Sequence, residues 1–111
     1  MLSTGVKYDA GKPRVSLLPP LATLEVAKVL TFGAQKYAPG NWKIVENGPE
    51  RYLDASLRHV FAYMAGESGD SETSLSHLAH AICCLMFILD IETQNQLEKN
   101  ENLPRNNQNP A

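Results

Sequence analysis

The three histidines of this chain, His59, His77 and His80, all fall within residues 51–80. His77 and His80 are spaced i, i+3, so they share one face if that segment is helical. His59, carried by an antiparallel helix, can add a third imidazole. Neutral imidazole is a common ligand of transition metals, so the set predicts a metal or ligand site. The alternative is that the rings are half-buried and satisfied by nearby carboxylates or backbone carbonyls.

An acidic turn, Glu67, Asp70 and Glu72, lies between the first histidine and the other two. Several carboxylate oxygens are what a hard divalent cation such as magnesium or manganese requires. The same residues can instead cap the start of the following helix, where the macrodipole favours negative charge. Both interpretations are open, and one carboxylate can serve both.

Cations and aromatic residues suited to a nucleotide lie elsewhere in the chain. Gly11-Lys12-Pro13-Arg14 resembles a short phosphate-gripping loop without P-loop spacing, and Arg58 suits bidentate phosphate contact. Asp54 precedes Arg58 by four residues, so we also expect an ion pair between them. Tyr37 and the pair Asn41-Trp42 can stack on and hydrogen-bond a base, or Trp42 can close one end of a hydrophobic core.

Composition limits the classes of protein that fit. With 111 residues and a net charge of −2, the chain is expected to form one domain without an extended nucleic-acid surface. The N-terminus has no apolar signal region, and the longest apolar run, residues 81–89, is too short to span a bilayer. Cys83 and Cys84 fit buried thiols in a reducing compartment. We therefore expect a cytoplasmic protein.

The elements that would position these residues are all helical. Apolar spacing and turn residues predict helices over about 20–37, 50–65 and 73–94, the second with an apolar stripe of Leu53, Leu57, Val60, Phe61 and Met64. The predicted fold is an all-α bundle of three to four helices with a long N-terminal loop. Residues 1–94 form its domain, and residues 95–111 are predicted to be a disordered polar tail. The small core and the apolar third helix also predict self-association.

In chain order, a series of short motifs resembles the phage dATP/dGTP diphosphohydrolase-like family. The motifs are YDAGKPR, LLPP, VLTFGAQKY, NW, RYLDASLRH, GESGDSE and HLAH, which cover roughly residues 7–90. The ordered series is specific, although no single motif is. The resemblance implies hydrolysis of a purine (deoxy)nucleotide to monophosphate and pyrophosphate in the cytoplasm of a phage-infected or lysogenic bacterium. It also implies a distant relation to the all-α NTP pyrophosphatases, which are dimers or tetramers with magnesium or manganese between helices.

The resemblance and the residues together give the expected site. The catalytic candidates are His59, Glu67 and Asp70. The candidate ligands of a magnesium or manganese ion are Glu67, Asp70, Glu72, His77 and His80. The candidate substrate-binding residues are Lys12, Arg14, Lys36, Tyr37, Asn41, Trp42, Asp54 and Arg58.

The chain departs from the all-α pyrophosphatases at the carboxylates that usually identify them. Those enzymes carry E-x-x-E on one helix and E-x-x-D on the next, whereas here Glu25 is followed by Lys28 at i+3, and His77-x-x-His80 stands where E-x-x-D is expected. The turn also reads Thr73-Ser74 where the family tends to have glycine. The departure leaves a second hypothesis, a phage protein that binds and sequesters a nucleotide, including a defence-signalling nucleotide, without cleaving it. A third is a structural oligomerisation module.

Overall fold

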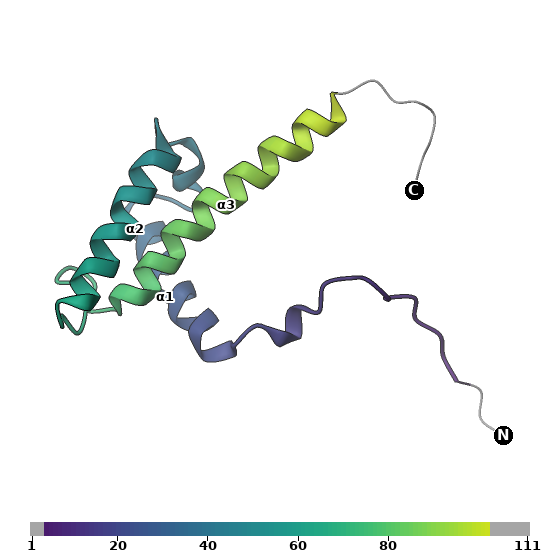
Figure 1. Ribbon diagram of the computed structural model, residues 1–111, viewed down its shortest axis with the longest axis horizontal. Coiled ribbons are helices and arrows are strands. Elements are labelled where there is room, and N and C mark those ends of the chain that lie inside the picture. The colour runs from purple at the N-terminus through teal and green to yellow at the C-terminus, as the bar shows by residue number, and fades with distance from the viewer. Residues whose placement is uncertain (1–3, 103–111) are drawn as a thin grey trace.

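The computed structural model describes residues 4–102, which form three α-helices, two short 3-10 helices and no strand. The elements in order are η1 (Val15–Leu17), α1 (Pro20–Lys36), η2 (Asn41–Ile44), α2 (Gly48–Met64) and α3 (His77–Glu101). Helices α2 and α3 run antiparallel and side by side, and α1 packs against α3 (Figure 1). The predicted all-α fold is confirmed.

The first two helices end close to their predicted limits, and the third does not. Helix α1 begins at Pro20, whose fixed φ suits a first turn, and α2 begins at Gly48. Helix α3 begins at His77 because the Ser76 hydroxyl caps it, accepting a hydrogen bond from the Leu78 backbone N–H at 3.1 Å. It ends at Glu101, seven residues beyond the predicted limit. Residues 103–111 of the predicted tail lie outside the described residues.

Small side chains form the contact between α2 and α3. Ser56 of α2 is buried, and its hydroxyl donates to the Ala81 carbonyl of α3 at 3.2 Å. Ala81 is itself buried. Because these side chains are short, the two helix backbones can approach closely.

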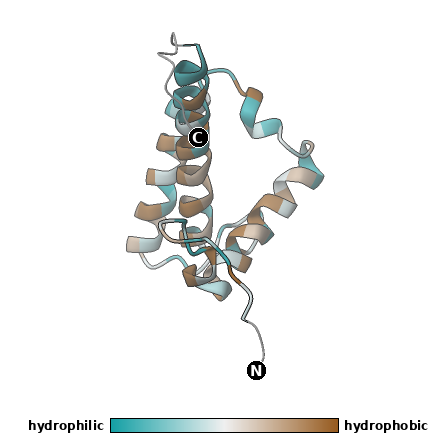
Figure 2. Ribbon diagram, turned by 90° about the vertical axis from the view of Figure 1, so that its right-hand side faces the viewer, coloured by the Kyte–Doolittle hydropathy of each residue, from teal (hydrophilic) through white to brown (hydrophobic). Residues whose placement is uncertain are grey.

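The predicted apolar stripe of α2 is largely exposed. Leu53, Leu57, Phe61 and Met64 are 45–72% exposed, so the face of α2 that meets α3 is the one with Ser56 and His59. Apolar residues nevertheless occur along all three helices (Figure 2). Within the described residues, the fold thus leaves a large part of its apolar surface uncovered.

Residues 4–19 form an N-terminal arm that extends away from the helix pair (Figure 1). Every residue of the arm is exposed, including those of η1. No helix in the described part of the chain is both long and apolar enough to cross a membrane.

Candidate metal and nucleotide site

A tight loop between α2 and α3 fixes the position of Asp70. The Asp70 backbone N–H donates to the Leu75 carbonyl at 2.9 Å, and the Ser74 N–H donates to the Asp70 carbonyl at 2.8 Å. Gly69 leaves room for this closure, because a Cβ at that position would lie 3.1 Å from the Ser74 carbonyl oxygen and the loop would have to shift. The closed loop presents the Asp70 side chain towards the first turn of α3.

The Asp70 carboxylate also caps this loop. Its Oδ2 accepts from the backbone N–H groups of Glu72 at 2.9 Å and Thr73 at 3.0 Å. Burial raises the pKa of Asp70, but these two hydrogen bonds and the nearby histidines outweigh it and hold the pKa below its ordinary value. The group is therefore a carboxylate at neutral pH, and one of its oxygens is already oriented by the backbone.

His59, Asp70 and His77 converge at the end of the α2–α3 pair. One ligating atom of each lies within 4.8 Å of the others, and the Nδ1 atoms of His59 and His77 are 2.9 Å apart. Two nitrogens bound to one ion at about 2.1 Å lie roughly 3.0–3.4 Å from each other. The two nitrogens, which contact each other as hydrogen-bond partners here, are therefore near the spacing of two ligands on one ion, and Asp70 completes a group of three candidate ligands within 4.8 Å of one another.

The other nitrogen of His77 supports this arrangement. His77 is buried, and its Nε2 has no hydrogen-bond partner, although the Glu67 carboxylate lies 3.6 Å away. A histidine that binds a metal through one nitrogen usually donates its other N–H to a carboxylate or carbonyl, which orients the ring. Glu67 is placed to be that partner, because its carboxylate faces Nε2 while Nδ1 faces the cluster.

His80 adjoins the cluster without converging on it. Its ring stacks on His59 with centroids 4.5 Å apart, and its Nε2 contacts the Thr73 hydroxyl at 2.7 Å. Burial, followed by the His80 charge, lowers the pKa of His59, and burial likewise lowers the pKa of His80. Both rings thus favour the neutral form, which is the form that binds a metal.

Glu72, a predicted ligand, does not join the cluster. Its Oε2 instead accepts from Lys36 Nζ at 2.8 Å, which ties the loop to the end of α1. The hydrogen bond and charge of Glu72 raise the pKa of Lys36. In this structure Glu67, Asp70 and Glu72 therefore do not converge as one ligand set.

The other predicted substrate-binding residues are spread over the surface. Lys12 and Arg14 lie on the exposed arm, and Tyr37 is exposed with Lys36 Nζ 5.2 Å from its ring centroid. Asp54 and Arg58 are exposed, and the expected ion pair between them is absent from the described ion pairs. In water an exposed pair gains too little energy to fix two long side chains.

Trp42 follows the second of its two predicted alternatives and closes the other end of the helix pair. Its ring stacks on Phe87 with centroids 4.5 Å apart, and the Tyr52 hydroxyl donates to the Trp42 carbonyl at 2.9 Å. Asn41, its neighbour, opens η2 and is partly buried. At least one face of the indole is therefore occupied by the protein itself.

The sequence reasoning missed Thr73 as a site residue. Its hydroxyl contacts His80 Nε2 and also accepts from the Leu75 backbone N–H at 3.1 Å. Thr73-Ser74 stood out as a departure from the family's glycine, but nothing in the sequence indicated that the Thr73 hydroxyl contacts His80.

The fold and the cluster together define an all-α protein with a candidate metal site between two antiparallel helices. Residues 3–101 match the family described as dATP/dGTP diphosphohydrolase, N-terminal, and the chain belongs to this family. A curated relative from Salmonella phage PMBT28, named dATP/dGTP diphosphohydrolase, is 48% identical over 85 residues. That match covers 77% of this chain but only 29% of the relative. No solved structure gave a significant match.

Proposed function

We propose that this chain is a metal-dependent nucleotide diphosphohydrolase that cleaves dATP, dGTP or related purine nucleotides into monophosphate and pyrophosphate. The convergence of His59, Asp70 and His77 within 4.8 Å carries the proposal. The name of the phage relative supports the substrate class. In the reaction a water oxygen bonds to the α-phosphorus, the bond from that phosphorus to the bridging oxygen breaks, and pyrophosphate leaves.

The donor set favours a transition metal over magnesium. Two imidazole nitrogens and one carboxylate oxygen suit manganese or zinc, whereas magnesium prefers oxygen ligands and retains its waters. His59, Asp70 and His77 would hold the ion, and manganese is the member of the expected pair that the nitrogens fit. When bound, such an ion supplies Lewis acidity towards a phosphate oxygen and lowers the pKa of water.

The surrounding residues have distinct roles in this proposal. Glu67 orients His77 through Nε2, and its exposed carboxylate can also accept the proton of the attacking water. His80, held by Thr73 and stacked on His59, keeps the His59 ring in its orientation. Arg58 lies one residue before His59 on an exposed surface, where it can meet the charge of a phosphate.

The test is hydrolysis of dATP and dGTP with manganese, followed by release of pyrophosphate. We expect turnover that requires the metal and that is lost in His77→Ala. Nucleotide and manganese binding without pyrophosphate from any purine triphosphate would contradict the catalytic proposal.

Sequestration of a nucleotide without cleavage is the second candidate. The absence of the E-x-x-E motif favours this candidate. The all-α pyrophosphatases carry that pair of carboxylates on one helix, whereas here Glu25 is followed by Lys28 at i+3. It predicts that the nucleotide stays bound after chelation by EDTA and is recovered intact. Loss of the nucleotide on chelation would exclude it.

A homo-oligomer of two or four copies is part of the proposal. Five large apolar residues of the arm are 57–85% exposed: Val6, Tyr8, Val15, Leu17 and Leu18. Together with the exposed stripe of α2, these side chains offer apolar surface that contacts between copies of the chain would cover. Sedimentation equilibrium should give a mass above 12.2 kDa, and a monomer at micromolar concentration would contradict this assembly.

A further inference from the structure

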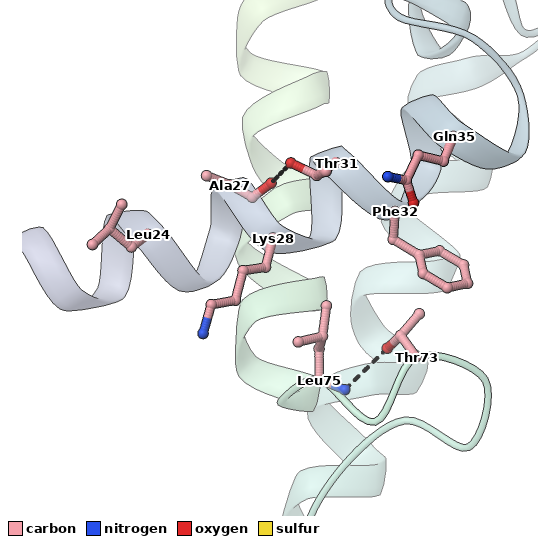
Figure 3. Close-up of a pocket in the computed structure, with 8 residues that line it drawn as sticks. All are labelled: Leu24, Ala27, Lys28, Thr31, Phe32, Gln35, Thr73 and Leu75. Atoms are coloured by element: carbon pink, nitrogen blue, oxygen red, sulfur yellow. Dashed lines mark hydrogen bonds between the residues drawn. The ribbon is translucent and has the colours of Figure 1, made fainter.

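A groove of about 500 Å³ lies between α1 and the loop that precedes α3. Leu24, Lys28, Phe32 and Gln35 line it from α1, and Thr73 and Leu75 line it from the loop (Figure 3). In this view Phe32 lies close to Thr73, and Gln35 lies beside Phe32. The volume lies within the range of roughly 300–1,000 Å³ that is typical of small-molecule sites.

The lining matches a nucleobase in chemistry. Phe32, which is partly buried, and the aliphatic Leu24 and Leu75 offer apolar faces on both sides of the groove. A flat aromatic base can stack on such a ring whatever its sequence identity. The exposed Gln35 amide supplies one donor group and one acceptor, which together can read the N6 and N7 edge of adenine. Lys28 also lines the groove, and its ammonium pairs with Glu25 at 2.6 Å.

One residue connects this groove to the histidine cluster. Thr73 lines the groove, and its hydroxyl contacts His80 Nε2 at 2.7 Å. His80 in turn stacks on His59, whose Nδ1 lies 2.9 Å from that of His77. A nucleotide with its base in the groove can therefore direct its phosphates towards the cluster over a short path.

The aromatic end of the molecule is less suited to hold the base. Trp42 stacks on Phe87, which follows His77 by ten residues along α3. At 1.5 Å per residue the two α3 positions are about 15 Å apart along the helix axis. A base held at Trp42 would thus begin much farther from the cluster than one beside Thr73.

We infer that the groove between α1 and residues 73–75 holds the purine base of the nucleotide, with Phe32 stacking on it and Gln35 reading its edge. This inference rests on the proposed function, because it takes the phosphates to be bound at the histidine cluster. It assigns base recognition to α1 and not to Tyr37 and Trp42.

Titration calorimetry with manganese, dATP and inorganic tripolyphosphate tests the inference, because tripolyphosphate has no base. The wild-type protein should bind dATP more tightly than tripolyphosphate. Phe32→Leu should weaken dATP binding by about tenfold, as expected for a lost stacking contact, and leave tripolyphosphate binding within twofold. The matched control is Phe61→Leu, which changes an exposed phenylalanine on α2 outside the groove and should alter neither affinity.

The second variant, Gln35→Leu, removes the amide without adding charge. It should weaken dATP binding and change the preference between dATP and dGTP, whereas Gln94→Leu, an exposed control on α3, should not. Equal affinities of the wild-type protein for dATP and tripolyphosphate, or equal losses for both in Phe32→Leu, would overturn the inference and leave the proposed function standing. Failure of the wild-type protein to bind either ligand with manganese would instead contradict the proposed function.

A second copy of the chain is the alternative occupant of the groove. In that case Phe32→Leu would lower the mass in sedimentation experiments and leave the affinity for dATP unchanged. That result would also overturn the inference.

Discussion

The two ends of the α2–α3 pair are built from different chemistry. At one end Trp42, Tyr52 and Phe87 pack ring against ring, and the one hydroxyl among them has a backbone partner at 2.9 Å. At the other end His59 and His77 approach each other at 2.9 Å, and a buried ring nitrogen of His77 has no hydrogen-bond partner. One end is closed by aromatic packing, and the other brings together nitrogen and oxygen atoms that could serve as metal ligands.

The aromatic end of the α2–α3 pair thus contributes to stability, and the histidine end contributes to function. Two imidazoles and a carboxylate that converge at the end of a helix pair form a group of potential ligands, and such clusters of titratable side chains are typical of functional sites. Aromatic packing of the kind at the other end contributes mainly to folding. Substitutions at the two ends should therefore have opposite consequences.

The largest effect is expected from the ligand set. Asp70→Asn and His77→Ala should each weaken manganese binding by more than about 100-fold, since loss of even an outer-shell partner typically costs 10–100-fold. Calorimetry with MnCl₂ measures this loss. Asp54→Asn, an exposed carboxylate on α2, is the control and should retain wild-type affinity. Equal manganese affinity in Asp70→Asn and the wild type would show that Asp70 is not a metal ligand.

Trp42→Ala tests the opposite end. We expect it to lower the free energy of unfolding by about 2 kcal/mol, which is below the 3–5 kcal/mol of a fully buried aromatic because Trp42 is only partly buried. Urea denaturation measures the change, and manganese affinity should stay within twofold. Tyr37→Ala, at 64% exposed, is the control and should leave stability near wild type. A large loss of manganese binding in Trp42→Ala would contradict the separation of the two ends.

The sequence predicts the limits of the helices better than it predicts the histidine cluster. Apolar spacing and turn residues were enough to place α1 and α2 within two residues of their observed limits. The histidines were recognised as a set because they are rare and their spacing is helical. Asp70 was expected in one site with them, but which of the candidate carboxylates and imidazoles converge was not predictable, because it depends on how the loop closes through backbone hydrogen bonds.

The end of α3 and the inner face of α2 were predicted wrongly for physical reasons. The polar residues after Gln94 suggested disorder, but Gln94 pairs with Glu98 and Gln96 with Asn100 at i, i+4 spacing along the helix. The large apolar residues of α2 suggested its inner face, but Ser56 permits the closer contact with α3. Burial therefore follows the fit between two helices more than the hydropathy of one.

Ser74→Gly tests a local strain that belongs to the histidine end. Ser74 has a φ of +63°, in the left-handed region that glycine adopts without steric cost. At the aromatic end the comparable residue is Asn47 with φ +56°, and asparagine tolerates that conformation better than serine. We expect Ser74→Gly to raise the free energy of unfolding by up to about 1 kcal/mol. Asn47→Gly should gain less, and a loss of stability in Ser74→Gly would contradict the assignment of strain.

The smallest effect is expected from Glu72→Gln. The Lys36–Glu72 pair is exposed on both sides, so water screens it and its loss should scarcely alter unfolding. Manganese affinity should also remain within twofold, because the Glu72 carboxylate pairs with Lys36 and is not part of the His59, Asp70 and His77 cluster. Calorimetry on Glu72→Gln and Asp70→Asn in parallel thus compares two neighbouring carboxylates of one loop. If Glu72→Gln lost manganese as Asp70→Asn does, the acidic turn would act as a single ligand set, and the histidine end would need a different geometry from the one described.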